Sequence, residues 1–364
     1  MMRIGILGTR GIPNAYGGFE QFAEFLALGL SQKGHTVSVY NSSLHPYKNA
    51  TWNDIHIIHC KDLEDKIGTA GQFIYDLNCI KDARKRKFDI LLQLGYTSNS
   101  IWHWLWPKNS VNIINMDGLE WKRSKYSSLT QKFLKKAEKW AAQKGKILIA
   151  DSIGIQQYLS QTYHKQSVFI PYGANIFTSP DPGCLAEWNI KPHHYHLLIA
   201  RMEPENNIEM IIRGHLAVKQ PYPLILIGNY TNAFGHYLYK KYNSAEIRFK
   251  GGLYDQEKIN NIRYFSALYF HGHSVGGTNP SLIEAMGCGC NIAAHDNIFN
   301  RAVLGEDAFY FSNEDNIAGL LSNDYCSPSI INRKKKNITK VETLYNWKTI
   351  VQQYEAVFLG AVGA

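Results

Sequence analysis

The fold of this chain is indicated first by Arg3-Ile-Gly-Ile-Leu-Gly-Thr-Arg-Gly-Ile-Pro-Asn-Ala-Tyr-Gly-Gly-Phe-Glu20. Residues 3–7 are a short apolar run typical of a buried strand, and a glycine-rich segment follows at 8–18. Four apolar residues then recur at helical spacing: Phe19, Phe22, Leu26 and Leu30. Gly34 ends the predicted helix. A buried strand, a glycine-rich turn and a helix in this order predict a parallel α/β sheet.

The alternation of strand and helix continues along the chain and then restarts. Further strand-like runs lie at 36–40, 55–59, 89–94, 111–116, 147–150 and 168–171. Residues 175–192 hold three prolines, which predicts a linker. Beyond it we expect strands at 196–200, 224–228, 247–250, 267–270 and 291–294, with helices beginning at Asn207, Asp255 and Pro280. A variable basic stretch at 327–340 precedes a final amphipathic helix at 345–358.

We therefore predict an α/β protein with two Rossmann-like domains, residues 1–174 and 175–344. A chain of 364 residues is longer than one hydrophobic core usually organises. Open parallel sheets bind ligands beyond the carboxyl ends of their strands, so two such sheets facing a central cleft would bind substrates there.

Composition limits the class of protein and its partners. With 45% hydrophobic and 19% charged residues, the chain is typical of a globular protein. The formal charge of +9 favours anionic ligands such as nucleotides, but no nucleic-acid-binding motif accompanies it. The six cysteines show no paired metal-ligand spacing, so we expect reduced thiols and no metal. We expect a cytoplasmic protein, because neither a signal-peptide core nor an apolar run of about eighteen residues is present.

Three segments carry residues suited to binding a diphosphate. The glycines of 8–18 let the backbone approach a ligand, although the dinucleotide spacing Gly-x-Gly-x-x-Gly is missing and a plain strand-to-helix turn is the alternative. The second segment, His271-Gly-His-Ser-Val-Gly-Gly-Thr-Asn-Pro-Ser-Leu-Ile-Glu-Ala-Met-Gly287, leads a strand into a helix. Backbone amides of 277–281 would face the phosphates, and Glu284 would face ribose hydroxyls unless it is a solvated helix residue.

The third segment is Ala200-Arg-Met-Glu-Pro-Glu-Asn-Asn207, directly after a predicted strand. Arg201 is placed to bind phosphate through two N–H groups and to balance the charge of a leaving group without a metal. A surface salt bridge is the alternative for Arg201.

Together these segments resemble the GT-B glycosyltransferases, in particular the large retaining family numbered four. The resemblance covers nearly the whole chain and implies that helix 345–364 returns to the first domain. Arg10-Gly-Ile-Pro with Tyr16-Gly-Gly-Phe-Glu, and Asn115-Met-Asp-Gly-Leu-Glu-Trp-Lys-Arg123, are similar to the subgroup with bacterial rhamnosyltransferases of surface polysaccharides. That subgroup implies dTDP-rhamnose as donor and a saccharide acceptor, polyprenyl-linked, in capsule or O-antigen assembly.

Two positions depart from the pattern of that family. Gly276 stands where a glutamate usually contacts the donor sugar, so sugar recognition would pass to the backbone or to His273. Asn206 stands where the family has a clamp lysine, which leaves Arg201 as the principal cation.

The resulting site prediction has three parts. The catalytic residues would be Asp117, Arg201 and Glu284, with Asp117 or Glu120 orienting the acceptor hydroxyl or taking its proton. A helix-capping or loop-stabilising role is the alternative for both first-domain carboxylates. Acceptor binding would use Tyr16, Asp117 and Glu120. Donor binding would use Gly17, Gly18, Arg201, Asn206, His273, Gly276, Gly277, Thr278, Asn279, Ser281 and Glu284.

Residues 132–140 are basic and apolar at helical spacing, which is compatible with peripheral contact at the inner face of a membrane. Trp102, Trp104 and Trp106 would add interfacial rings. The alternative is a helix that packs its apolar side on the sheet.

The sequence thus predicts a retaining, metal-independent glycosyltransferase with a nucleotide sugar as donor substrate, no cofactor and no nucleic-acid partner. One rival is a sugar-nucleotide epimerase or dehydrogenase, which would need the missing dinucleotide motif. Another is a noncatalytic nucleotide-sugar-binding subunit, favoured by Gly276 in place of the glutamate.

Overall fold

The structure is a computed structural model that describes residues 1–15, 17–123, 126–219, 221–323 and 328–363. The chain divides into two compact units. Unit 1 comprises Met1–Lys122, Tyr126–Gly173 and Trp347–Ala364, and unit 2 comprises Ala174–Asn346 together with Arg123.

Unit 1 contains an eight-stranded sheet in the order β3-β4-β2-β1-β5-β6-β7-β8. All neighbours pair in parallel except β3 and β4, which pair antiparallel at one edge. The strands are β1 (Arg3–Leu7), β2 (Thr36–Ser42), β3 (Thr51–Trp52), β4 (Ile55–Cys60), β5 (Ile90–Leu94), β6 (Val111–Asn115), β7 (Ile147–Ala150) and β8 (Val168–Phe169). The interior strands are largely apolar and almost wholly buried, as expected for a parallel sheet with helices on both faces.

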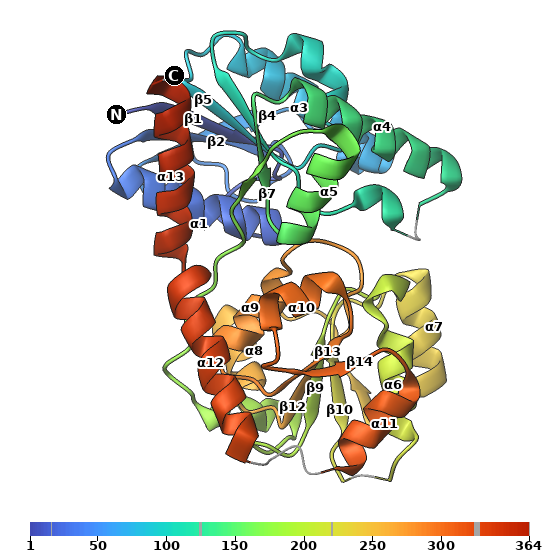
Figure 1. The fold of residues 1–364 in the computed structure, drawn as a ribbon. Coiled ribbons are helices and arrows are strands. Elements are labelled where there is room, and N and C mark those ends of the chain that lie inside the picture. Colours follow the sequence, from blue (N-terminus) through green and yellow to red (C-terminus); the bar gives the residue numbers. More distant parts are fainter. Residues whose placement is uncertain (16, 124–125, 220, 324–327, 364) are drawn as a thin grey trace. The chain divides into compact units, whose positions relative to one another are not determined.

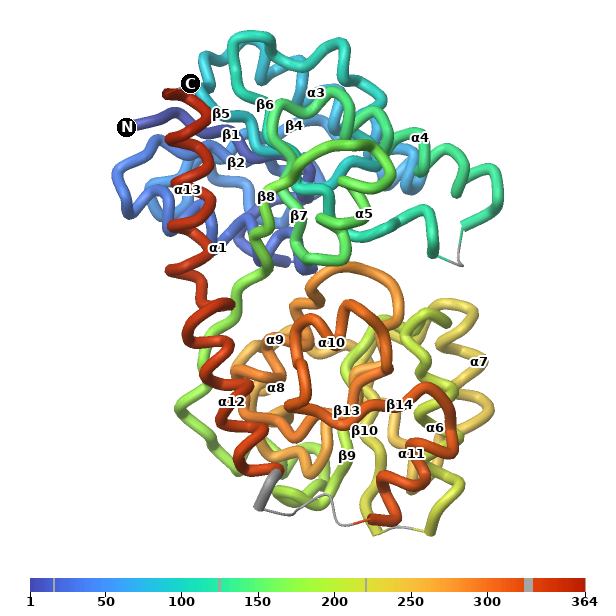
Figure 2. The backbone as a smooth tube through the Cα atoms, in the orientation of Figure 1, coloured from blue at the N-terminus to red at the C-terminus, as the bar shows by residue number. Residues whose placement is uncertain are grey.

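The helices of unit 1 lie on both sides of this sheet (Figure 1). They are α1 (Gly18–Gln32), α2 (Glu64–Ile67), α3 (Gly71–Ala83), α4 (Ser128–Lys144), α5 (Ile153–Tyr163) and α13 (Trp347–Gly363), with short 3₁₀ turns η1 (Gly68–Ala70), η2 (Ser100–Leu105) and η3 (Glu120–Lys122). The final helix, α13, lies beside α1 (Figure 2). The approach is close: a Cβ on Gly29 would lie 2.5 Å from Val351, and the rings of Phe25 and Trp347 stack at 4.5 Å.

Unit 2 has a six-stranded, wholly parallel sheet in the order β11-β10-β9-β12-β13-β14. Its strands are β9 (His196–Ile199), β10 (Leu224–Ile227), β11 (Ile247–Phe249), β12 (Leu268–His271), β13 (Ile292–His295) and β14 (Phe309–Phe311). Its helices are α6 (Ile208–Leu216), α7 (Ala233–Tyr242), α8 (Gln256–Tyr264), α9 (Pro280–Gly287), α10 (Ile298–Leu304), α11 (Glu314–Ser322) and α12 (Pro328–Leu344), with the 3₁₀ turns η4 (Pro182–Trp188) and η5 (Pro204–Asn206).

The strand order places a topological switch point in each sheet. In unit 2 the chain runs outward from β9 to β10 and β11, then returns to the other side of β9 with β12. In unit 1 it runs outward from β1 to β2 and β4, then returns beside β1 with β5. Loops that leave β9 and β12, or β1 and β5, therefore diverge at the carboxyl edge, where open parallel sheets bind ligands.

The predicted α/β fold with two parallel-sheet domains is confirmed, and the differences are local. The stretch 327–340, expected to be variable, is largely helical from Pro328 onward, because α12 packs against α9. Its apolar residues Ile330 and Val341 are buried, although lysines and an arginine between them hide the helical pattern. The linker 175–192 contains η4, whose first turn is capped by Asp181. The short strands β3 and β14 were not predicted.

Candidate functional site

The loops that follow β9 and β12 in unit 2 are joined by hydrogen bonds. The backbone N–H and the hydroxyl of Ser274 both donate to the Glu205 carbonyl oxygen, at 3.0 and 2.8 Å. The Asn207 side-chain amide donates to the Gly272 carbonyl oxygen at 2.8 Å. A Cβ on Gly272 would lie 2.0 Å from the Asn206 carbonyl oxygen, so this approach requires glycine. The two predicted donor-binding segments are therefore one assembled element at the switch point.

Arg201 is exposed at the start of this element, and its backbone is held by hydrogen bonds within the same loop. Its carbonyl oxygen accepts hydrogen bonds from the side-chain amide of Asn206, at 2.7 Å, and from the N–H of Glu203, at 2.8 Å. Asn206 is 5% exposed. The residue at the clamp-lysine position thus holds the backbone of Arg201 and supplies no second cation.

Three aromatic side chains lie on one face of β12 and of the residues that follow it, next to this element. They are Tyr269, His271 and His273, which occupy every second position. The rings of His271 and His273 stack with centroids 4.4 Å apart, and both ring nitrogens of His271 are without a partner among the described residues. Burial first, and then the charge of Arg201, lower the pKa of His273 to about 3. Burial and the Arg201 charge both make protonation of His273 unfavourable, so His273 is a neutral imidazole at physiological pH.

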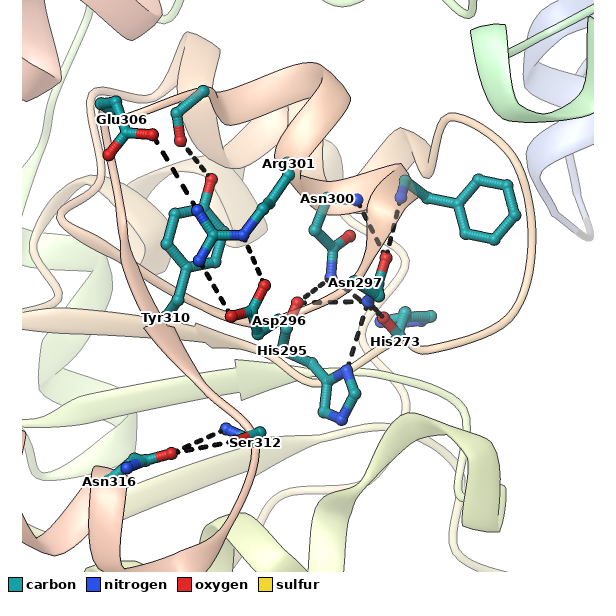
Figure 3. Close-up of polar contacts among 12 residues, drawn as sticks. His273, His295, Asp296, Asn297, Asn300, Arg301, Glu306, Tyr310, Ser312 and Asn316 are labelled. Carbon is teal, nitrogen blue, oxygen red and sulfur yellow. Dashed lines mark hydrogen bonds and ion pairs between the residues drawn. The ribbon is translucent and has the colours of Figure 1, made fainter. Parts of the chain in front are cut away.

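The backbone at His273 is held by the loop that follows β13 (Figure 3). The side-chain amides of Asn297 and Asn300 each donate to the His273 carbonyl oxygen at 3.0 Å. Asn297 also caps α10 by accepting from two backbone N–H groups at its first turn. The neighbouring Arg301 lies over the Tyr310 ring and pairs with Asp296 of the same loop.

Glu284 points to a partner that the sequence did not indicate. Its Oε2 lies 2.7 Å from Nη2 of Arg263, whose side chain is 2% exposed. Burial, the largest single effect, lowers the pKa of Arg263, but the Glu284 carboxylate together with Tyr269, Cys288 and Cys290 raises the pKa overall. The same guanidinium donates to Ser281 Oγ at 3.1 Å, and Tyr269 shares that hydroxyl at 2.7 Å. Arg263 lies on α8 without any motif around it, so no sequence signal could have identified it.

The first turn of α9 partly corrects the predicted phosphate site. The side chain of Asn279 accepts from the Ser281 N–H at 3.0 Å and so caps the helix. The Ser281 amide is therefore already bonded and does not face a ligand as expected. The predicted Gly276 has φ +129, a conformation that favours glycine, while Gly277 is half-buried and Thr278 is buried.

In unit 1 the glycine-rich loop after β1 is held on several sides. Glu20, 4% exposed, accepts from the Thr9 hydroxyl at 3.0 Å and from the Arg10 N–H at 2.9 Å. The Asn41 side chain forms two hydrogen bonds with the backbone of Ile12, at 3.0 and 2.7 Å. A Cβ on Gly8 would lie 2.3 Å from the Leu94 carbonyl oxygen on β5. The hydrogen bonds hold the loop in place, and the close packing against β5 explains why position 8 is glycine.

The end of that loop leads into α1 at the predicted donor-binding glycines. Gly17 occupies the N-cap position with extended backbone and provides no side-chain cap, and Gly18 begins the helix. Tyr16, predicted to bind the acceptor, lies outside the described residues.

Asp117 follows β6 and adopts a left-handed backbone conformation, with φ 45. Its N–H donates to Asn115 Oδ1 at 3.1 Å. Glu120 begins η3, and its N–H donates to the Tyr96 hydroxyl at 3.2 Å. Non-glycine residues in this conformation often mark functional loops, and this one carries both predicted acceptor carboxylates.

Metal-binding clusters and membrane-spanning helices are both missing from the described ranges. The described residues contain no group of three or more histidine, cysteine or acidic side chains arranged for a metal ion. No helix in these ranges is both long and apolar enough to traverse a bilayer.

Comparison with known proteins identifies the architecture. Residues 1–175 match a family model described as a domain of unknown function, DUF1972. The curated proteins include no significant sequence match. Among solved structures, sucrose-phosphate synthase from Thermosynechococcus elongatus shares 16% identity with a TM-score of 0.83, covering 99% of both chains. The fold is that of the GT-B glycosyltransferases.

Two more of these structures agree with that assignment of the fold. HepE of Anabaena, in complex with UDP-glucose, shares 12% identity with a TM-score of 0.75, covering 99% of this chain and 100% of the other. A glycosyltransferase from Rickettsia africae shares 13% identity with a TM-score of 0.71, covering 99% of this chain and 98% of the other. At these identities the GT-B likeness concerns the backbone, and the chemistry depends on the residues described above.

Proposed function

We propose that this protein is a glycosyltransferase that moves a sugar from a nucleoside diphosphate carrier to a saccharide acceptor. Unit 2 would hold the donor and unit 1 the acceptor. The observation that carries the proposal is the assembled element at the unit 2 switch point, where Arg201 is exposed beside His273. It is supported by the GT-B fold and by the UDP-glucose bound to HepE.

The chemistry follows from charge. Cleavage of the bond between sugar and diphosphate leaves negative charge on the phosphate oxygens. Arg201 would stabilise that charge through two N–H donors, and its fixed backbone means that little reorganisation is needed during reaction. His273, being neutral, can donate one ring N–H without repelling Arg201, and Glu284 would accept from ribose hydroxyls.

The more specific features rest on the sequence resemblance. We propose dTDP-rhamnose as donor, retention at the anomeric carbon, and a polyprenyl-linked saccharide acceptor in surface polysaccharide synthesis. Asp117 would orient the acceptor hydroxyl, with Glu120 beside it, and the departing phosphate would take the proton. We also propose that 1–174 with 345–364 and 175–344 are the functional domains.

The first experiment measures thermal shifts of the full chain with dTDP, UDP, dTDP-rhamnose, UDP-glucose and NAD. A ligand at 100 times its Kd stabilises the folded state by about 2.7 kcal/mol. We expect dTDP and dTDP-rhamnose to raise Tm and NAD to leave it unchanged. The transferase proposal fails if no nucleoside diphosphate has an effect, and a shift with NAD alone would favour a dehydrogenase or epimerase.

The second experiment tests Arg201 with n-octyl glycosides as acceptor probes. Arg201→Ala should lower the transfer rate by about 100-fold, the magnitude found for removal of one oxyanion donor, with Tm unchanged. The matched control is Arg213→Ala, whose guanidinium is exposed and pairs with Glu314 at 3.1 Å at the end of α6. Unchanged transfer in Arg201→Ala would remove Arg201 from the site. Transfer by the wild-type chain would exclude the alternative of a noncatalytic nucleotide-sugar-binding subunit.

Peripheral membrane contact is a separate part of the proposal. The apolar side of α4 is buried at Leu134, Ala137 and Ala141, so this helix packs into unit 1. Of the three tryptophans, Trp106 is buried, Trp102 donates to a backbone oxygen and Trp104 is 57% exposed.

Contact would therefore depend on Trp104 and the exposed lysines of α4, Lys132, Lys136 and Lys139. Cosedimentation with vesicles of phosphatidylglycerol and phosphatidylcholine should fall in Trp104→Ser. Equal sedimentation of the variant and the wild type would contradict this surface.

A further inference from the structure

A buried carboxylate in α4, Glu138, gathers hydrogen-bond donors from several parts of unit 1. Glu138 is 1% exposed. Its Oε1 accepts from the hydroxyls of Tyr158 and Tyr163, each at 2.6 Å, and from Lys135 Nζ at 3.0 Å. The ammonium group of Lys135 also lies 4.6 Å from the Tyr158 ring centre and 5.4 Å from that of Tyr163. On this side the charge of the Glu138 carboxylate is balanced by Lys135, and its oxygen is surrounded by hydrogen-bond donors.

The other oxygen of Glu138 binds the segment that carries the predicted acceptor residues. Oε2 accepts from Trp121 Nε1 at 3.0 Å and from the Tyr96 hydroxyl at 3.3 Å. Lys135 lies 4.3 Å from the Trp121 ring centre as well. Tyr96 is 1% exposed, and its hydroxyl oxygen lies 3.1 Å from the Gly118 carbonyl oxygen and accepts from the backbone N–H of Glu120.

These contacts fix the loop 117–122 at three points. The Tyr96 hydroxyl accepts from the Glu120 N–H and shares its single hydrogen between the Gly118 carbonyl oxygen and Glu138 Oε2. Glu138 also accepts from the indole N–H of Trp121. The loop begins with Asp117 in its left-handed conformation and ends in η3, neither of which is set by sheet or helix pairing. A loop of this kind keeps an unfavourable conformation only where its surroundings determine it.

Packing of α4 does not require a buried charge, because its apolar residues Leu134, Ala137 and Ala141 are already buried where the helix packs against η2, η3 and α5. An isolated carboxylate in this position would be strongly unfavourable, and the surrounding donors make it tolerable only in one geometry. The geometry therefore points to a role for Glu138 in specifying the conformation of its neighbours.

We propose that Glu138 is a positioning residue that, through Tyr96 and Trp121, sets the loop 117–122 for acceptor binding. This inference rests on the proposed glycosyltransferase function for the identity of the ligand, a saccharide hydroxyl. It concerns the acceptor alone, because every residue in the network belongs to unit 1.

The test compares acceptor and donor kinetics in Glu138→Gln, using the n-octyl glycoside that the wild-type chain glycosylates fastest. A displacement of about 1 Å at a reacting group lowers rates by about 100-fold, so we expect kcat/KM for the acceptor to fall at least about tenfold. Donor hydrolysis and the thermal shift with dTDP should stay within about twofold of wild type. The matched control is Glu355→Gln, which weakens the ion pairs of Glu355 with Lys33 and His35. Both partners lie just before the amino end of β2. Equal losses in both variants, or acceptor kinetics unchanged in Glu138→Gln, would overturn the inference.

A second variant keeps the test decisive if Glu138→Gln does not fold. Tyr96→Phe removes one hydroxyl and leaves Glu138 its other four donors. It should show the same selective loss of acceptor kcat/KM, and the double variant should lose little more than either single one. Full acceptor activity in Tyr96→Phe would contradict the proposed route.

Hydrogen exchange separates failure of this inference from failure of the proposed function. In either variant the backbone N–H of Glu120 should exchange at least about tenfold faster than in the wild type, whatever the ligand of the protein is. Accelerated exchange with no transfer or nucleotide binding by the wild type would retain the positioning role and reject the transferase. Unchanged exchange would reject the positioning role itself.

Discussion

Arg263→Met is the perturbation whose outcome the structure specifies most closely. The arginine side chain is 2% exposed and the Glu284 side chain 15% exposed, with 2.7 Å between Nη2 and Oε2. Methionine has a similar unbranched shape but leaves the carboxylate without its cation. Breaking a buried ion pair from one side costs about 3 to 5 kcal/mol, and the partial exposure of Glu284 favours the lower figure of about 3 kcal/mol.

That loss predicts a shift of the unit 2 transition. For domains of about 150 to 250 residues, 1 kcal/mol corresponds to about 2 to 4 °C in Tm, so we expect a decrease of about 6 to 12 °C. Adding Glu284→Gln removes the unpaired charge and should restore about 2 kcal/mol. Arg213→Met is the control, because its exposed pair contributes less than about 1 kcal/mol.

The assay is scanning calorimetry together with urea unfolding at pH 7. The reasoning would be refuted if Arg263→Met stayed within about 1 kcal/mol of wild type, or if the double variant were no more stable than Arg263→Met. Either result would mean that the carboxylate finds water or another donor once the arginine is gone.

Three further outcomes are expected. Burial, then His215, lowers the pKa of His196 to about 3, and burial lowers that of His215 to about 4. Because the unfolded histidines have a pKa of 6.5, the free energy of unfolding is highest above that pH and falls by about 1.4 kcal/mol per histidine at pH 5.5. His215→Gln should make the free energy of unfolding, measured with urea, depend less on pH. An unchanged pH dependence would contradict this expectation. Gly11→Ala, at φ +127 with a Cβ 2.3 Å from Asn41, should lower the free energy of unfolding by more than about 2 kcal/mol, against about 1 kcal/mol for Gly34→Ala in open space. Asn206→Ala removes a 2.7 Å hydrogen bond and should cost about 1 kcal/mol and raise KM for dTDP-rhamnose, whereas an unchanged KM would show that the Arg201 loop holds without it.

Much of the fold could be predicted because its signals are local. The buried parallel strands are short, largely apolar runs, and each expected strand from residue 3 to 150 appears within one or two residues of its predicted bounds. The exceptions have physical reasons. The strand β3 has only two residues, and the charged face of α12 interrupts its apolar spacing.

The candidate site was only partly accessible from the sequence. Glycine-rich turns and Arg201 could be placed beside strands, and the strand order then brings Arg201 and His273 to one switch point. Arg263 and Glu138 could not be found, because their roles depend on partners 21 and 17 to 42 residues away and on burial. The hydrogen bond from Asn206 to the Arg201 backbone could not be predicted for a similar reason, and donor binding by Asn206 stays a prediction.

The last helix makes unit 1 a discontinuous domain. Trp347 packs against Phe25, and Gly173 comes so close to the same indole that a Cβ would lie 2.4 Å from it. Between them the chain makes an excursion of 173 residues through unit 2, whose ends are joined by a hydrogen bond from Ala174 to Tyr345. A recombinant fragment ending at residue 173 would expose the groove that α13 fills and would be prone to aggregate. Chimeras that exchange unit 2 must therefore be joined at two junctions, with residues 347–363 retained from the parent that supplies the amino-terminal half.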